Sequence, residues 1–402
     1  MTQPEIVIIG LGYIGLPTAT LLASKKTNVL GVDINSKIVE TINRGEVHIV
    51  EPELDKAVYS AVKDGYLRAS IKAVQADTYI IVVPTPFKAK NEADISYVEA
   101  ATKSIIPLLK KGDLYIIEST SPVGTTEKMM RLIYGERPEL SGHLNIAYCP
   151  ERVLPGNVMY ELVNNDRVIG GINEESTEKA ILFYSKYIKG ELHKTNASTA
   201  EMCKLVENSS RDVQIAFANE LSIICDKAKI NVWELIKLAN KHPRVNILNP
   251  GSGVGGHCIA VDPYFIVSEY PMESKIIKSA RNVNDYKSFW CVEKIQSEKL
   301  KFELEHGRKP KTALMGLAFK QNIDDLRESP ATYITQKVLQ NSYNEEHFVV
   351  EPNITSHDIY KLTDYKVAIE KADIIVYLVA HDEFINEKVS NKIILDFAGV
   401  KK

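Results

Sequence analysis

The chain has 402 residues, enough for two or three domains, and its 45% hydrophobic and 25% charged residues are typical of an ordinary soluble globular protein. Its formal net charge of −3 gives no reason to expect nucleic acid or an anionic membrane as a partner. The five cysteines are an odd number without paired spacing, which argues against a disulfide framework and against a zinc site, so no metal is expected.

The chain opens on the apolar run Glu5–Gly10, which predicts a buried parallel strand, and a helix is expected over Leu16–Ser24. No basic start, long apolar core and cleavage site precede this strand, so we expect no signal peptide. No later apolar stretch reaches the roughly 18–20 residues that a membrane helix needs. The expected location is therefore the cytoplasm.

Further apolar runs that end in polar or turn residues predict more strands, with helical segments between them. Strands that alternate with helices in this way are typical of a parallel sheet of βαβ units. Residues 1–195 are therefore expected to form one Rossmann-like domain. The predicted strands are Asn28–Asp33, Thr78–Pro84, Leu114–Glu118, Asn145–Cys149 and Val168–Gly170.

The pattern then changes, because Thr199–His242 contains no strand-like run and its apolar residues recur at helical spacing. Residues 196–305 are expected to form a central helical domain, whose apolar faces belong either to the core or to a subunit interface. After the linker His306–Pro310 the βα pattern returns, and 308–402 predicts a smaller domain of about 95 residues. The predicted fold is α/β, with two Rossmann-like parallel-sheet domains joined by the helical domain.

The segment from Gly10 to Gly15 matches the G-x-G-x-x-G pattern between the first strand and the first helix. In this pattern Gly10 permits a tight turn, Gly12 lets a pyrophosphate approach the backbone, and Gly15 lets helix and strand pack closely. Asp33 ends the next strand, where a carboxylate can bind both ribose hydroxyls and disfavours a 2′-phosphate. Together these features predict an NAD site, and the alternative is a glycine turn in an unrelated α/β sheet.

Cys258 ends a glycine-rich run and lies four residues before Asp262. A cysteine on a turn that lets backbone approach a ligand suits a nucleophile. Lys204 and Asn208 lie one helical turn apart, and a cationic donor beside an amide donor suits an oxyanion or a bound water. The alternative for this pair is a solvated polar face. A nicotinamide site with a cysteine nucleophile suits oxidation of an alcohol through an aldehyde to an acid.

Two motifs follow predicted strands and therefore lie at the carboxyl edge of the sheet, where α/β proteins bind ligands. The first, ESTSPVGTT from Glu118, contains Thr120, and capping of a helix by its Ser or Thr side chains is the alternative to ligand binding. The second, CPER from Cys149, offers Glu151 as a candidate general base. Cys149 itself is expected to be a buried apolar residue.

Together these motifs resemble those of the nucleotide-sugar 6-dehydrogenases, a family that includes UDP-glucose and GDP-mannose dehydrogenases. The matching segments run in family order over nearly the whole chain. They are GLGYIGLP at Gly10, ESTSPVGTT at Glu118, CPERVLPG at Cys149, AEMCKLVEN at Ala200, GVGGHCIAVDP at Gly253 and GLAFKQNIDDLRESPA at Gly316. Within the family, INRGEVHIVEP at Ile42, HPRVNIL at His242 and HCIAVDPYF at His257 look most like bacterial UDP-N-acetyl-D-mannosamine dehydrogenases.

The resemblance implies two NAD-dependent oxidations at the C6 hydroxyl of a UDP-sugar, with UDP-N-acetyl-D-mannosamine as the expected substrate and surface polysaccharide such as capsule as the destination. Cys258 would attack the aldehyde and carry a thioester, which water activated by Glu151 would hydrolyse. A water near Lys204 and Asp262 would help to take the hydroxyl proton. Lys204 and Asn208 would stabilise the oxyanions, and Thr120 would position the water or the hydroxyl.

The resemblance also implies which residues bind the ligands, and it implies a homodimer, because Arg244 would reach the substrate from a neighbouring subunit. Without the resemblance, we would interpret Lys320 and Arg327 as a solvated basic pair. The expected cofactor contacts are Gly10, Gly12, Tyr13, Ile14, Gly15, Asp33, Thr85, Thr120 and Arg327. The expected substrate contacts are Glu151, Arg152, Val153, Leu154, Lys204, Asn208, Arg211, Arg244, Asn249, Gly251, Gly255, Phe319 and Lys320.

Three alternatives stay open. UDP-N-acetylglucosamine or UDP-glucose could be the substrate of the same mechanism. A single-step hydroxyacid dehydrogenase also carries a Lys and an Asn on one helix but needs no cysteine, so it would tolerate Cys258→Ser. A non-enzymatic NAD-binding protein would bind the cofactor without turning over any nucleotide sugar.

Overall fold

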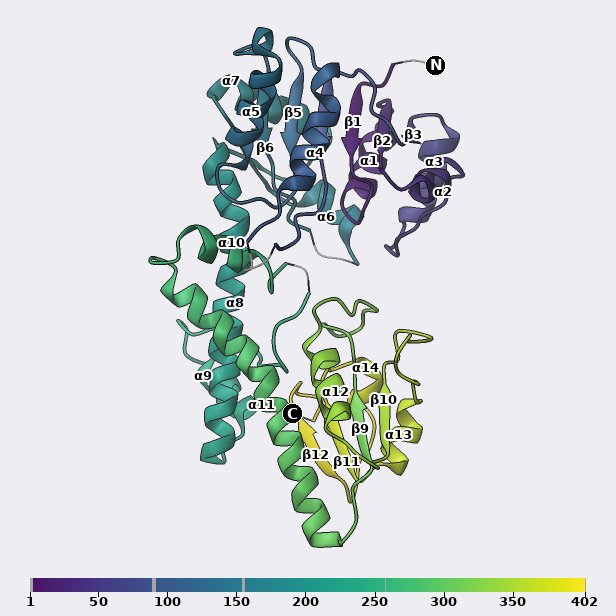
Figure 1. Ribbon diagram of the computed structural model, residues 1–402, viewed down its shortest axis with the longest axis vertical. Helices are drawn as coiled ribbons and strands as arrows, with labels where there is room; N and C mark the ends of the chain where they lie inside the picture. The colour runs from purple at the N-terminus through teal and green to yellow at the C-terminus, as the bar shows by residue number, and fades with distance from the viewer. Residues whose placement is uncertain (1–2, 89–91, 154–155, 257, 402) are drawn as a thin grey trace. The chain divides into compact units, whose positions relative to one another are not determined.

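The structure is a computed structural model that describes residues 3–88, 92–153, 156–256 and 258–401. The chain divides into two compact units, Met1–Val206 and Glu207–Lys402, and each contains a β-sheet (Figure 1).

The first unit is built on an eight-stranded sheet in the order β3-β2-β1-β4-β5-β6-β7-β8. The strands from β3 to β6 in this order pair in parallel. Its central strands are short apolar runs that are buried throughout, as a parallel sheet covered on both faces requires. The strands are β1 Ile6–Ile9, β2 Val29–Val32, β3 Leu67–Ser70, β4 Thr78–Ile81, β5 Leu114–Ile117, β6 Asn145–Tyr148, β7 Arg167–Gly171 and β8 Leu192–Asn196.

Helices cover both faces of this sheet (Figure 1). Successive β1 side chains enter opposite cores: Ile6 and Ile8 pack with one set of helices, and Val7 and Ile9 pack with the other. The helices are α1 Gly15–Ser24, α2 Ser36–Asn43, α3 Leu54–Lys63, α4 Ser96–Ile105, α5 Thr125–Glu136, α6 Val158–Asn164 and α7 Glu174–Tyr184, with short 3-10 helices at Ile106–Leu108 and Pro138–Leu140.

The expectation that Val168–Gly170 would extend the parallel pattern is wrong, because β7 pairs antiparallel with β6, with Ala147 opposite Gly171. A parallel strand would require the chain to cross back over the sheet after β6. Instead, the described part of the connection carries the seven-residue helix α6 alone, and β7 begins at the edge where β6 ends. The first residue of β7, Arg167, is thereby brought to the carboxyl edge of the sheet.

The central region is helical, as expected. Its helices are α8 Ala197–Ala228, whose first residues belong to the first unit, α9 Val232–Ala239, α10 Asp262–Glu269 and α11 Lys275–His306. Buried polar contacts join α8 to α11: Arg281 donates to Asp212 at 2.7 Å, and Asn284 donates to the same carboxylate oxygen at 2.8 Å. Among the described residues, no helix is both long enough and apolar enough to cross a membrane.

The C-terminal region contains a four-stranded parallel sheet in the order β10-β9-β11-β12. Gly316 follows its first strand with a φ of +100°, and Gly10 follows β1 with a φ of +99°, so both sheets begin with the same kind of turn. The predicted α/β fold with two Rossmann-like ends is confirmed. The strands are β9 Thr312–Met315, β10 His347–Val350, β11 Ile374–Tyr377 and β12 Ile393–Asp396, and the helices are α12 Pro330–Gln340, α13 Tyr365–Lys371 and α14 Asp382–Ile385.

Candidate active site

The first glycine-rich turn joins β1 to α1. A Cβ atom at Gly10 would lie 2.1 Å from the carbonyl oxygen of Val82, and one at Gly15 would lie 1.9 Å from the carbonyl oxygen of Gly10. At Gly12, in contrast, no heavy atom of the described residues, apart from its own chain neighbours, lies within 4 Å of the Cβ position. Gly10 and Gly15 therefore serve the fold, whereas Gly12 leaves the backbone open to a ligand.

Asp33 lies directly after β2 and faces the same turn. Its carboxylate accepts hydrogen bonds from the backbone N–H of Leu11 at 3.0 Å and of Asn35 at 2.9 Å. Helix α1 begins after Tyr13 and Ile14 without a side-chain cap. The N-terminus of a helix suits a pyrophosphate, and a carboxylate after the second strand suits ribose hydroxyls, so these residues fit NAD.

Thr85 and Thr120 lie together beyond the ends of β4 and β5. The Thr85 hydroxyl donates to the backbone carbonyl of Thr120 at 2.7 Å. The neighbouring Ser119 hydroxyl accepts the backbone N–H of Val83 at 2.8 Å. These bonds fix the two strand ends to each other at the edge of the sheet where the glycine turn also lies.

Glu151 follows β6 and is buried, with a relative exposure of 9%. Burial raises the pKa of its carboxyl to about 7, although the positive charges of Lys204 and Arg167 lower it. Its Oε1 atom has no hydrogen-bond partner among the described residues. A carboxyl group with a pKa near neutrality is well suited to general-base catalysis.

A group of buried polar side chains near Glu151 was not identified from the sequence. Tyr184 donates to Glu118 at 2.6 Å, and Arg167 lies 3.8 Å from the same carboxylate oxygen. Arg167 also lies 4.0 Å from the sulfur of Cys149. Burial raises the pKa of the Cys149 thiol to about 11, so this cysteine is the buried, unreactive residue that the sequence predicted.

Glu201 is a second residue that sequence reasoning missed. Near the start of α8, its carboxylate accepts hydrogen bonds from the backbone N–H of Gly124 at 2.6 Å and of Thr126 at 2.7 Å, and from the Thr126 hydroxyl at 2.6 Å. The ESTSPVGTT motif thus does begin a helix, but a carboxylate from α8 caps it in place of a Ser or Thr of its own. Because Lys204 lies one turn further along α8, the same bonds fix its backbone.

In the second unit, three predicted catalytic residues lie together. Asn208 donates to the Asp262 carboxylate at 2.5 Å, which joins α8 to the start of α10. The carbonyl of the half-buried Cys258 accepts the backbone N–H of Asp262 at 2.8 Å. Residues 250–256 and 258, which we call the cysteine loop, are also held at Gly251, whose N–H donates to Asn219 at 2.9 Å.

The remaining predicted residues are spread over both units. Arg152 donates to the carbonyl of Asp166 at 3.3 Å, and Arg327 donates to Asp325 at 2.6 Å. Leu154 lies outside the described residues. Val153, Gly255 and Phe319 are partly buried, and Arg211, Arg244, Asn249 and Lys320 are exposed.

Three models of the UDP-glucose/GDP-mannose dehydrogenase family match this sequence in order. The NAD binding domain matches residues 4–188, the central domain 198–286 and the UDP binding domain 313–402. The chain belongs to this family. It is therefore a nucleotide-sugar dehydrogenase.

Individual members of the family are similar over the full length. The UDP-N-acetyl-D-mannosamine dehydrogenase of Campylobacter jejuni is 54% identical over 406 residues, covering 97% of this chain and 98% of the relative. The Escherichia coli K12 enzyme of the same name is 52% identical over 421 residues, covering 100% of both chains. A solved UDP-D-ManNAc dehydrogenase from Pyrococcus horikoshii superposes with a TM-score of 0.88 at 38% identity, covering 99% of this chain and 96% of that one.

Proposed function

We propose that this nucleotide-sugar dehydrogenase oxidises the C6 hydroxyl of UDP-N-acetyl-D-mannosamine to the carboxylate of UDP-N-acetyl-D-mannosaminuronic acid. The full-length similarity to two enzymes named UDP-N-acetyl-D-mannosamine dehydrogenase carries this choice of substrate. The acid would serve as a precursor of surface polysaccharide such as capsule.

The cofactor is NAD, held by the open backbone at Gly12, the N-terminus of α1 and the Asp33 carboxylate. When bound, NAD would accept the hydride that leaves C6 in each of the two oxidations, one molecule of NAD being reduced each time. Asp33 disfavours NADP, since its negative charge would face the 2′-phosphate. Thr85, Thr120 and Arg327 complete the proposed cofactor contacts.

In the first oxidation, Lys204 and Asp262 hold a water that takes the proton of the C6 hydroxyl, and Thr120 positions the hydroxyl. Asn208 stabilises the oxygen as negative charge develops on it, together with Lys204. A side-chain amide nitrogen carries two hydrogens, so Asn208 keeps one donor for this oxygen while the other binds Asp262.

In the second oxidation, the Cys258 sulfur adds to the aldehyde carbon to form a thiohemiacetal. Loss of a hydride from that carbon converts it to a thioester. Glu151 then takes a proton from a water that attacks the thioester carbonyl. The carbon–sulfur bond breaks, which releases the carboxylate and restores the thiol.

We also propose a homodimer in which Arg244 acts on the substrate of the neighbouring subunit. Large apolar side chains exposed on α8 and α9 support a subunit interface, since covering them with a second copy of the chain would remove apolar surface from water. Phe217 is 54% exposed, Ile224 53% and Leu238 62%.

NADH formation with UDP-N-acetyl-D-mannosamine, UDP-N-acetylglucosamine and UDP-glucose, measured in parallel, tests the proposal. Two NADH per UDP-N-acetyl-D-mannosamine, with little from the other sugars, is the expected result. Preference for either other sugar would overturn the substrate and keep the mechanism, whereas one NADH per sugar would overturn the thioester.

A further inference from the structure

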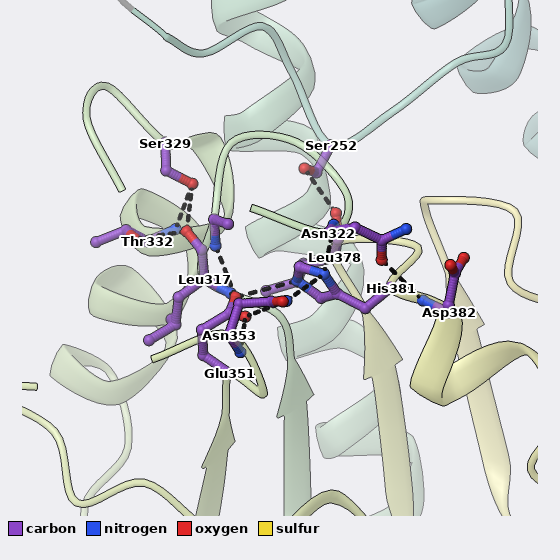
Figure 2. A network of polar contacts seen from close by, with 11 residues as sticks. Ser252, Leu317, Asn322, Ser329, Thr332, Glu351, Asn353, Leu378, His381 and Asp382 are labelled. Carbon is purple, nitrogen blue, oxygen red and sulfur yellow. Dashed lines mark hydrogen bonds and ion pairs between the residues drawn. The ribbon is translucent and has the colours of Figure 1, made fainter. Parts of the chain in front are cut away.

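A buried acid–histidine pair in the C-terminal region has no part in the proposed chemistry (Figure 2). Glu351 follows β10 and His381 follows β11, and both side chains have a relative exposure of 0%. Their Oε2 and Nε2 atoms lie 3.1 Å apart. Burying two such groups is costly unless their polar atoms are used, so their other partners show what the pair does.

Three of those partners are backbone N–H groups at the start of one loop, residues 317–328, which we call the nucleotide loop. The fourth is Asn353, whose backbone N–H donates to Glu351 Oε1 at 3.0 Å and whose amide nitrogen lies 3.0 Å from His381 Nδ1. Glu351 Oε2 accepts the N–H of Leu317 at 2.8 Å and of Ala318 at 2.9 Å. His381 Nδ1 accepts the N–H of Asn322 at 3.0 Å. Because Nδ1 accepts this bond, Nε2 carries the proton and donates to Glu351. The pair therefore fixes the first part of the nucleotide loop (Figure 2).

The two ends of the nucleotide loop are also bound to each other. The hydroxyls of Ser329 and Thr332 donate to the carbonyl of Leu317 at 2.6 Å and 2.9 Å. The closed loop carries Phe319, Lys320 and Arg327, which are the proposed ligand-binding residues of the C-terminal region.

The nucleotide loop packs directly on the cysteine loop within the second unit. The N–H of Gly256 donates to the carbonyl of Arg327 at 3.2 Å. A Cβ atom at Gly255 would lie 2.6 Å from the carbonyl oxygen of Glu328 and 2.8 Å from the Cβ of Phe319. Only glycine permits this approach, so a shift of one loop displaces the other.

The other end of the cysteine loop is bound beside His381. The Ser252 hydroxyl donates to the carbonyl of Leu378, just beyond β11, at 3.1 Å (Figure 2). The Ser288 hydroxyl of α11 donates to the Ser252 carbonyl at 2.9 Å. The cysteine loop is thus fixed both by the nucleotide loop and by the strand that leads to His381.

We propose that the Glu351–His381 pair is a positioning device for the substrate: it sets the shape of the nucleotide loop for a nucleoside diphosphate and, through that loop, the place of Cys258. Asp33 occupies the corresponding position after β2, but it is only partly buried and accepts one N–H of the glycine turn, that of Leu11, besides the N–H of Asn35. Glu351, in contrast, is buried beneath the nucleotide loop and binds two of its backbone N–H groups, those of Leu317 and Ala318. The inference rests on the proposed function, which assigns the diphosphate to this loop.

Two substitutions of His381 each keep one of its two hydrogen bonds, the one that Nδ1 accepts from Asn322 or the one that Nε2 donates to Glu351. His381→Asn keeps an acceptor near the Nδ1 position and loses the donor to Glu351, whereas His381→Gln keeps a donor near Nε2 and loses the acceptor for Asn322. His381→Phe keeps neither. We expect the Phe variant to bind UDP about tenfold more weakly in calorimetry on the full chain, and the Asn variant to recover more affinity than the Gln variant.

The same variants report on the cysteine loop. In His381→Phe, alkylation of Cys258 by iodoacetamide, followed by mass spectrometry of its peptide, should be faster than in the unaltered chain. The KM for the UDP-sugar should rise more than the KM for NAD, because Arg327 is the one residue of the nucleotide loop among the proposed cofactor contacts. Glu351→Gln should behave like His381→Phe, because an amide cannot supply oxygen acceptors at both of its ends.

The chain offers a matched control at the opposite end of β10. His347 lies 3.4 Å from Glu345, and both side chains are largely buried. His347→Asn should leave UDP affinity and Cys258 alkylation unchanged. Loss of NADH binding would indicate that His381→Phe does not fold. In that case the UDP affinities of the Asn and Gln variants test the inference.

Unchanged UDP affinity in folded His381 variants, or no UDP binding by the unaltered chain, overturns the inference. UDP binding by the unaltered chain without oxidation of any nucleotide sugar overturns the proposed function instead and leaves the positioning role standing.

Discussion

Arg167 and Glu118 form a buried ion pair, with the guanidinium 3.8 Å from the carboxylate and both side chains at most 4% exposed. Tyr184 donates to the same carboxylate at 2.6 Å. Burial raises the pKa of Glu118, while the charge of Arg167 and the hydrogen bond from Tyr184 lower it. The two charges also act on Glu151 in opposite directions, because Arg167 lowers its pKa and Glu118 raises it.

This opposition predicts two shifts of opposite sign in the pH profile of turnover. With a Glu151 pKa of about 7, activity that requires the ionised base should rise with pH through that value. Arg167→Met removes a positive charge and should move the rise to higher pH by about one unit. Glu118→Gln removes a negative charge and should move it to lower pH. Shifts of the same sign in both variants would contradict this electrostatic role.

The glycine turn predicts a separation of stability from cofactor binding. Gly12→Ala should leave the melting temperature unchanged and weaken NAD binding, because the added methyl group meets no protein atom and would occupy space that the pyrophosphate needs. Gly10→Ala should destabilise the fold, since its Cβ would lie 2.1 Å from the Val82 carbonyl oxygen. Thermal unfolding and NAD titration measure the two effects. Equal NAD affinity for Gly12→Ala and the unaltered chain would place the cofactor elsewhere.

The strands that could be predicted from sequence are those buried on both faces, such as β1 and β5, because they appear as unbroken apolar runs. The edge strands β3 and β8 were missed. Residues Leu67–Ser70 alternate between buried and half-buried, and Leu192–Asn196 are mostly exposed, so neither contains an apolar run. The direction of β7 depends on the path of the connection before it, which local composition does not encode.

The site residues also fall into those that could be predicted from the sequence and those that could not. Asp33 and Lys204 were found because spacing along one strand or helix places them relative to a motif. Arg167, Glu201 and His381 were missed because each acts on a partner far along the chain. Glu201 lies 77 residues from Gly124, for example, and a single buried Glu leaves no periodic signal.

Glu201 yields a prediction of stability. Glu201→Ala removes three charge-assisted hydrogen bonds and leaves the backbone N–H groups of Gly124 and Thr126 without their acceptor. We expect a loss on the order of 3 kcal/mol in urea unfolding. Glu220 on the same helix is exposed, and Glu220→Ala should cost less than about 0.5 kcal/mol. Equal effects of the two changes would mean that the Glu201 carboxylate contributes nothing beyond its helix.

The proposed thioester mechanism predicts that substitutions of Cys258 and Glu151 stop the reaction at different steps. Cys258→Ser should yield at most one NADH per sugar and no carboxylate, because a serine hydroxyl is a far weaker nucleophile towards the aldehyde. Glu151→Gln should instead complete both oxidations once per active site and then stop, because the thioester is not hydrolysed.

The product of each variant, and the intact mass of the protein, distinguish these outcomes. Glu151→Gln should carry the added mass of an acylated Cys258, and Cys258→Ser should not. Cys203→Ser serves as the control, since this half-buried cysteine of α8 has no assigned role and should keep two NADH per sugar. Full carboxylate formation by Cys258→Ser would remove the cysteine from the mechanism.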